Sequence, residues 1–154
     1  TGKYLPSAWD NRHLLTLSGT YKLPKNWDIG LKLRVMGGAP FTPYDENLSS
    51  IVSAWDATAR PYYDYGLYNT GRLKTFSQID FRLDKSFYFK GVMLGIYIDL
   101  QNIGNFKYDS QPVLVSTGVV DPQIYPDGNQ HYKMKYIRQQ SGTILPTLGL
   151  TVEF

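Results

Sequence analysis

The sequence predicts an all-β fold made of long antiparallel strands, and three observations support this. Side chains alternate between apolar and polar over about ten residues at a time, which is the pattern of a strand with two different faces. The connections between these segments are alternately short and long. No stretch approaches the ~20 consecutive apolar residues that a membrane-spanning helix requires.

The composition indicates a chain that faces something other than water. Of the 154 residues, 15% are aromatic and only 19% are charged, against roughly 25% charged residues in an ordinary soluble domain. The net charge of +3 is small and its basic residues are scattered, so a nucleic-acid partner is not expected. The absence of cysteine excludes a disulfide scaffold, and two histidines leave little room for a zinc site. We expect neither a metal nor a cofactor.

Five segments carry the alternation, and they are the predicted strands: 14–23, 27–36, 78–87, 92–101 and 145–154. In each segment one parity is apolar, with Gly19 and Lys85 as the exceptions. Lys85 lies two residues from a predicted turn, where its amine can reach an interface or a local bulge can turn it away. The other parity is mostly polar, so one face of the predicted sheet avoids water and the other favours it.

Strand length and connection length favour a transmembrane antiparallel β-barrel segment. Ten to twelve residues at ~3.3 Å each, tilted by ~45°, match the ~25 Å apolar band of an outer-membrane barrel. The turns at 24–26 and 88–91 are short, whereas 37–77 and 102–144 are long. This predicts periplasmic turns and long extracellular loops. Tyr21, Trp27, Phe87 and Phe154 then form an aromatic girdle at the periplasmic interface, beside residues 88 and 89.

Five strands are too few to close a barrel, because bacterial single-chain barrels have an even number of strands, with eight as the usual minimum. An open edge in hydrocarbon also leaves backbone polar groups without partners. Residues 1–154 are therefore expected to be a partial outer-membrane β-barrel domain, completed by further strands. The start at Thr1, without a signal-peptide pattern, likewise predicts a piece of a longer or processed protein.

Several motifs carry a resemblance to a known family. They are WDNRHLLTLS at 9–18, LPKNWDIG at 23–30, GGAPFTPY at 37–44, IDFRLDKSF at 79–87, YIDLQNIGN at 97–105 and LGLTVEF at 148–154. In this order they resemble the C-terminal barrel strands of TonB-dependent outer-membrane receptors, especially those of Bacteroidetes-type bacteria. The terminal Phe154 is similar to the residue that the barrel-assembly machinery reads in that family.

The resemblance implies a role in active nutrient uptake across the outer membrane of a Gram-negative bacterium. It implies about five C-terminal strands of a barrel with about 22 strands, filled by a plug domain that is absent from this chain. The implied partners are outer-membrane lipid, the remaining barrel strands, the plug, and the TonB complex, which acts through the missing N-terminal region. A surface lipoprotein partner stays open, and siderophore, oligosaccharide, peptide and cobalamin all stay open as the ligand.

Charged side chains on the polar parity are the predicted lumen-facing or plug-facing residues: Lys32, Arg34, Asp80, Arg82, Asp84 and Asp99. Opposite charges on neighbouring strands are expected to pair across the sheet. Asp80 and Asp84 lie four residues or ~13 Å apart along one strand, wider than the ~5–9.5 Å between the carboxylates of glycoside hydrolases. With no recognisable nucleophile beside either histidine, the chain is not expected to be an enzyme.

The two long loops supply the candidate ligand-binding residues, because aromatic, arginine and asparagine side chains on loops suit recognition. They are Trp55, Arg60, Tyr62, Tyr63, Tyr65, Tyr68, Asn69, Arg72, Tyr125, His131 and Tyr132. The alternative for these residues is structural, with the rings packing loop against loop.

Two other functions remain open from the sequence. One is a passive porin or structural outer-membrane barrel assembled from several copies of the chain. The other is a soluble, aromatic-rich β-sandwich that binds carbohydrate on its loops, since a sandwich also alternates with period 2.

Overall fold

The computed structural model describes residues 4–154 and confirms an all-β protein with antiparallel sheets. The chain forms two compact units. The sheet unit consists of residues 12–37, 75–108 and 141–154, and the loop unit consists of the described part of 1–11 together with 38–74 and 109–140. Each predicted strand lies in the sheet unit, and most of each predicted loop lies in the loop unit.

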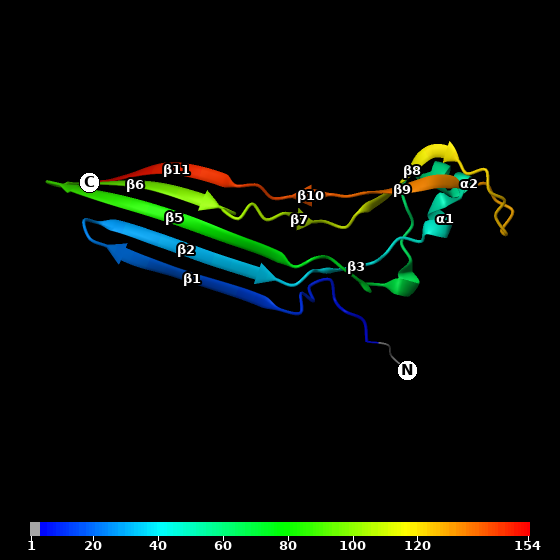
Figure 1. Ribbon diagram of the computed structural model, residues 1–154, viewed down its shortest axis with the longest axis horizontal. Coiled ribbons are helices and arrows are strands. Elements are labelled where there is room, and N and C mark those ends of the chain that lie inside the picture. The colour runs from blue at the N-terminus through cyan, green and yellow to red at the C-terminus, as the bar shows by residue number, and fades with distance from the viewer. Residues whose placement is uncertain (1–3) are drawn as a thin grey trace. The chain divides into compact units, whose positions relative to one another are not determined.

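Five strands lie side by side in the sheet unit (Figure 1), in the order β1-β2-β5-β6-β11. They are β1 (Leu14–Leu23), β2 (Trp27–Met36), β5 (Phe76–Phe89), β6 (Val92–Gln101) and β11 (Leu145–Glu153). All neighbouring pairs are antiparallel. The bounds of β1, β2 and β6 coincide with the predicted ranges, β5 is two residues longer at each end, and β11 ends one residue earlier.

The turn between β5 and β6 is shorter than the sequence predicts. Tyr88 and Phe89 pair with Met93 and Val92, so only Lys90 and Gly91 remain in the turn. Gly91 has φ +77°, a conformation that costs glycine little. The long strand β5 thus runs directly into a hairpin turn of two residues.

The register places the predicted apolar positions of all five strands on one face. Leu31 stands opposite Phe81, Phe81 opposite Leu100, and Leu100 opposite Pro146. Directly opposite residues in an antiparallel pair project to the same face. This face is not covered within the described chain, because Leu148 is 72% and Leu150 69% exposed. A soluble sandwich would bury such a face against a second sheet.

The exception on the apolar face, Lys85, is accommodated at the turns. The pairing of β5 with β2 and β6 runs through Lys85 without a shift, so the bulge that the sequence left open is not present. The Lys85 amine instead donates to the carbonyl of Lys25 in the β1–β2 turn. It lies 5.2 Å from the ring centroid of Trp27 and 5.0 Å from that of Phe87, where the ring faces attract the cation.

The loop unit contains regular structure that the period-2 pattern does not predict. Its elements are β3 (Pro40–Phe41), α1 (Glu46–Ser50), α2 (Val52–Thr58), the 3-10 turn η1 (Tyr65–Leu67), β4 (Gly71–Arg72), β8 (Val113–Val120) and β9 (Tyr132–Ile137). The short strands β7 (Tyr108–Asp109) and β10 (Gln140–Ser141) form a separate two-stranded sheet. No helix in residues 4–154 has the length and hydropathy to cross a membrane.

The loop unit has a small and mostly polar interior. Leu114 of β8 is 1% exposed, and it is the one fully buried large apolar side chain in residues 4–154. Ser49, Asn69 and His131 are also buried. Buried polar groups require hydrogen-bond partners, so the contacts of these three residues define how the unit is held together.

Candidate functional site

The polar face of the sheet brings together the six predicted lumen-facing residues from three strands. A depression of about 460 Å³ on this face is lined by Lys32, Arg34, Asp80, Arg82 and Asp99 among others. Asp84 stands opposite Asp28 on the neighbouring strand β2. The register therefore places charges of both signs on one face, as the alternation predicts.

Asp80 is the best-connected acid on this face. Arg34 Nη2 lies 3.3 Å from Asp80 Oδ2 across the β2–β5 pair. Gln78 Nε2 donates to Oδ1 at 2.6 Å, and the backbone N–H of Asn102 donates to the same oxygen at 3.0 Å. Lys32 stands directly opposite Asp80 in register but forms no ion pair within residues 4–154, so the diagonal arginine is the partner.

Arg82 pairs along its own strand rather than across the sheet. Its Nε and Nη2 donate to the two carboxylate oxygens of Asp84 at 2.9 and 2.8 Å, a fork geometry that suits a guanidinium. Asp99, which stands opposite Arg82 in register, is not its hydrogen-bond partner among the described contacts. The expectation of pairing across neighbouring strands thus holds for Arg34 with Asp80 and not for Arg82.

The Arg82 guanidinium also stacks on an aromatic ring. Its carbon lies 4.1 Å from the ring centroid of Tyr97 on β6. A Cβ atom added to Gly149 on β11 would come within 2.2 Å of the same ring, so the Tyr97 ring occupies the space that a side chain at residue 149 would need. The side chains of Arg82 and Tyr97 therefore form one stack over Gly149 that joins the three strands β5, β6 and β11 on the polar face.

Three candidates from the first loop hold the loop unit together. The Tyr62 backbone N–H donates to Ser49 Oγ at 2.8 Å, and its hydroxyl donates to the carbonyl of Ala54 at 3.2 Å. Asn69 is 6% exposed and donates from Nδ2 to the carbonyl of Pro6 at 2.8 Å. Arg72 forms an ion pair with Asp10 and donates to the carbonyl of Gly38 at 3.3 Å. These contacts assign structural roles to residues that the sequence predicted as ligand contacts.

The remaining candidates of the first loop present more surface to solvent. Tyr63, Tyr65, Tyr68 and Arg60 are exposed, and Trp55 is half-buried on α2. Tyr63 stacks on Tyr44, with ring centroids 4.9 Å apart. Burial, and then the hydrogen bond with Tyr63, raise the pKa of Tyr44 to about 12. This phenol therefore stays neutral at physiological pH.

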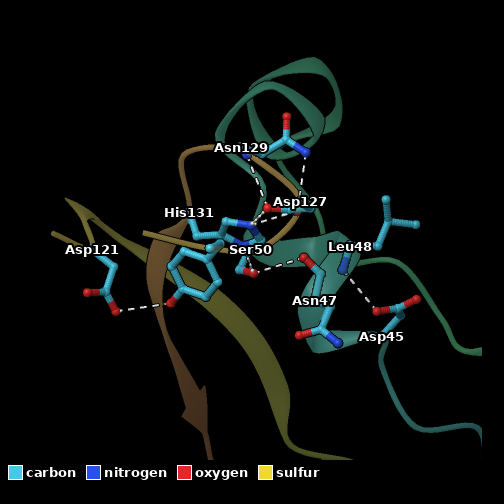
Figure 2. A network of polar contacts seen from close by, with 9 residues as sticks. Asp45, Asn47, Leu48, Ser50, Asp121, Asp127, Asn129 and His131 are labelled. Carbon is cyan, nitrogen blue, oxygen red and sulfur yellow. Dashed lines mark hydrogen bonds and ion pairs between the residues drawn. The ribbon is translucent and has the colours of Figure 1, made fainter. Parts of the chain in front are cut away.

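His131, predicted as a ligand contact, is buried in a polar network (Figure 2) and is only 3% exposed. Its Nδ1 lies 2.7 Å from Ser50 Oγ at the end of α1, and its Nε2 lies 3.0 Å from Asp127 Oδ2. Its ring stacks on Tyr125 with centroids 3.9 Å apart, and the Tyr125 hydroxyl donates to Asp121 at 3.2 Å. A ligand cannot reach a ring enclosed in this way, so the role of His131 is structural.

The contacts of Tyr132 and Ser50 complete this region. The Tyr132 hydroxyl donates to Asp56 of α2 at 3.2 Å, so the ring joins β9 to that helix. Ser50 Oγ donates to the carbonyl of Asn47 at 2.9 Å. The Asn47 carbonyl and His131 Nδ1 are therefore both placed to accept the one hydroxyl proton of Ser50. These contacts hold the end of α1 against the segment that contains Asp127 and His131.

Sequence reasoning missed several residues of these networks. Asp45 has a local signal, since it precedes α1 and its Oδ1 accepts the N–H of Leu48 at 2.9 Å, as an N-cap does. Ser50 and Tyr44 have no local sequence signal, because their partners His131 and Tyr63 are distant in the sequence. Within residues 4–154 no group of three His, Cys, Asp or Glu side chains is placed to hold a metal ion.

Comparisons of the chain with protein-family models, with curated proteins and with solved structures gave no match. The assignment of a function therefore depends on the geometry of the two units.

Proposed function

We propose that the sheet unit is a section of a β-barrel in the outer membrane of a Gram-negative bacterium. The observation that carries the proposal is the difference between the two faces of one sheet. One face is continuous, apolar and uncovered, as Leu31, Leu148 and Leu150 show. The other carries ion pairs such as Arg34–Asp80 and Arg82–Asp84. Lipid outside and a polar lumen inside account for both faces.

The dimensions of the strands agree with a bilayer. Strands β1, β2 and β6 have ten residues each, which at ~3.3 Å per residue and a tilt of ~45° rise about 23 Å. Trp27 and Phe87 flank the Lys85 amine beside the turns, an arrangement typical of a membrane interface.

The two outer strands of the sheet require further partners in a membrane. β1 and β11 each pair on one edge only within the described residues. In hydrocarbon each unpaired backbone polar group costs several kcal/mol. We therefore propose that additional barrel strands pair with both edges, supplied by a longer polypeptide or by further copies.

The finer proposal is a TonB-dependent receptor that takes up a bulky nutrient. It is supported by the ordered motifs from residue 9 to residue 154 and by the charged lumenal face. Ion pairs such as Arg34–Asp80 suit contact with a plug, because charged contacts form and separate reversibly in a wet lumen. The chemistry is binding and gated passage without a covalent step. The proposed partners are the plug and the TonB complex, with the surface lipoprotein open.

Single cysteines test the orientation of the sheet, because the chain has no cysteine of its own. Leu31→Cys and Lys32→Cys are neighbours on β2 with opposite parity and form a matched pair. Each variant of the membrane-embedded protein is labelled with bimane, and quenching by brominated lipid is measured. We expect strong quenching at residue 31 and little at residue 32. Equal quenching at both positions would refute the lipid-facing assignment.

The size of the native polypeptide separates the proposed receptor from the alternatives. An antibody against residues 52–68 is applied to outer membranes of the source cells. A polypeptide several times larger than 17.6 kDa agrees with a receptor that carries a plug. A band of 17.6 kDa that crosslinks into a discrete oligomer supports the porin, and a detergent-free monomer supports the soluble sandwich.

A further inference from the structure

We propose that the loop unit contains a binding site for a small planar ring compound that carries an anionic group, with a carboxylate as the simplest case. The site consists of two cavities that share Phe41 and Pro112 as lining residues. One, the aromatic cavity, has a volume of about 350 Å³, and the other, the basic cavity, about 250 Å³. Their combined volume falls within the ~300–1,000 Å³ that is typical of small-molecule binding sites. The compound would be the ligand of the proposed receptor, so the inference rests on the proposed function.

The aromatic cavity is lined by rings and prolines from three segments of the chain. Phe41 and Tyr44 come from the segment that includes β3, Pro112 precedes β8, and Tyr136 belongs to β9. Gln111, at the same wall, is held by a bond from its Nε2 to the carbonyl of Thr42 at 2.9 Å. Flat apolar surfaces of this kind favour stacking of a planar ring.

The two tyrosine rings of the aromatic cavity are held in position before any ligand binds. Tyr44 is stacked on Tyr63, and the Tyr136 hydroxyl donates to Glu46 Oε1 at 2.6 Å. Preorganised side chains reduce the entropy that binding costs. Burial, and then the hydrogen bond with Glu46, raise the pKa of Tyr136 to about 12. Both phenols therefore stay neutral, and the cavity wall gains no negative charge from them.

The basic cavity adds an excess of positive charge next to this apolar wall. It is lined by Arg72, Lys74 and Arg138 against one acid, Asp109. Lys74 pairs with Asp109 at 3.1 Å, and Arg72 pairs with Asp10. Arg138 has no ion-pair partner in the part of the chain that the structure describes. One cationic group thus remains for a ligand, and a guanidinium matches a carboxylate with two parallel hydrogen bonds.

Asp109, the one acid that lines the basic cavity, is already engaged by other groups. Hydrogen bonds from Gln140 at 2.6 Å and from Lys74, together with the nearby charges of Lys74 and Arg138, hold the pKa of Asp109 below its usual range. Asp109 therefore stays ionised and keeps Lys74 as its partner, so the carboxylate does not neutralise Arg138 by direct contact.

The positions of the charges select the class and the orientation of the ligand. Glu46 adjoins the aromatic cavity through Tyr136, and this carboxylate disfavours an anion at that end. Arg138 adjoins the basic cavity and favours one there. A ring seated beside Tyr44 with its anionic group toward Arg138 satisfies both requirements, whereas a neutral sugar uses neither charge.

Binding of 2-naphthoate to the full chain in detergent tests the inference by isothermal titration calorimetry, with a detergent-only titration subtracted. The same measurement uses 2-naphthamide, which keeps the rings without the charge, and acetate, which keeps the charge without the rings. We expect 2-naphthoate to bind more tightly than either. Arg138→Gln removes one solvent-accessible positive charge, and we expect this variant to bind 2-naphthoate roughly fivefold more weakly.

The matched control is Lys135→Gln, which removes one positive charge from β9 at a residue that lines neither cavity. We expect unchanged affinity in this variant. The inference is overturned if 2-naphthoate produces no heat of binding, if 2-naphthamide binds equally well, or if Arg138→Gln and Lys135→Gln behave alike. Lipid quenching at Leu31→Cys is measured on the same protein, so failure of the binding site and failure of the membrane proposal are distinguishable.

Discussion

Replacement of His131 by alanine perturbs the polar network that joins α1 to β9 in the loop unit. The ring is 3% exposed and makes two hydrogen-bonded contacts, to Ser50 at 2.7 Å and to Asp127 at 3.0 Å. It also stacks on Tyr125. The alanine variant loses all three contacts at once, and it leaves the Ser50 hydroxyl and the Asp127 carboxylate without this partner.

The expected loss follows from these contacts. Each hydrogen bond contributes about 0.5–1.5 kcal/mol, and an aromatic pair of this kind about 0.5–1.5 kcal/mol beyond its buried area. The sum is about 1.5–4.5 kcal/mol of local stability, which corresponds to an about 12- to 1,600-fold larger equilibrium population of the locally open state.

Hydrogen exchange measures this opening at specific amides. The Val52 N–H bonds to the carbonyl of Gln130 at 2.9 Å, and the Asp121 N–H bonds to the carbonyl of His131 at 2.7 Å. Both amides report on the contact between α1, α2 and the β8–β9 hairpin, because they exchange when the region opens locally. We expect the amide hydrogens of Val52 and Asp121 to exchange faster in His131→Ala, by the same factor as the increase in the open population.

The matched control is His13→Ala, which makes the same substitution at the other histidine. His13 is exposed and lies in the sheet unit, and a surface substitution of this kind changes stability by less than ~0.5 kcal/mol. Exchange at Val52 within threefold of wild type in His131→Ala, or equal to that in His13→Ala, would refute the structural role of His131.

Three further predictions concern single contacts. Gly149→Ala forces the Tyr97 ring away from β11 and lowers the stability of the protein in detergent by roughly 1–3 kcal/mol. The control Gly19→Ala does not, because nothing lies within 4 Å of its added Cβ. Equal melting temperatures of the two variants would contradict this prediction. Hydrogen bonds from Asn129 and then from His131 hold the pKa of Asp127 below the ordinary aspartate value of 3.8. The stabilisation of the loop unit by the Asp127 carboxylate is therefore present above pH 3.8 and is lost as the pH falls through the lower pKa of the folded state. Hydrogen exchange at the β9 end of the loop unit should accelerate over that pH range, and this acceleration should be absent in Asp127→Asn. Asp45→Ala removes the N-cap bond to Leu48 and lowers local stability by about 1 kcal/mol, measured as faster exchange in α1 and absent if the cap contributes nothing.

The strands and the two faces of the sheet were determined by the sequence alone. The predicted ranges 14–23, 27–36 and 92–101 are the strands β1, β2 and β6. A residue's side in a strand depends only on its parity, so local alternation is sufficient to place Leu31 and Lys32 on opposite faces. Parity does not determine where a strand ends, because pairing with the neighbouring strand decides that, and this accounts for the small errors at the ends of β5 and β11.

The tertiary structure decided which loop residues are buried and which charges pair. His131 and Asn69 are buried through contacts with Ser50 and Pro6, which are far away in the sequence, whereas Tyr65 is exposed. Such contacts are set by how the segments pack and leave no periodic signal. For the same reason the two cavities that share Phe41 and Pro112 could be found only in the folded loop unit.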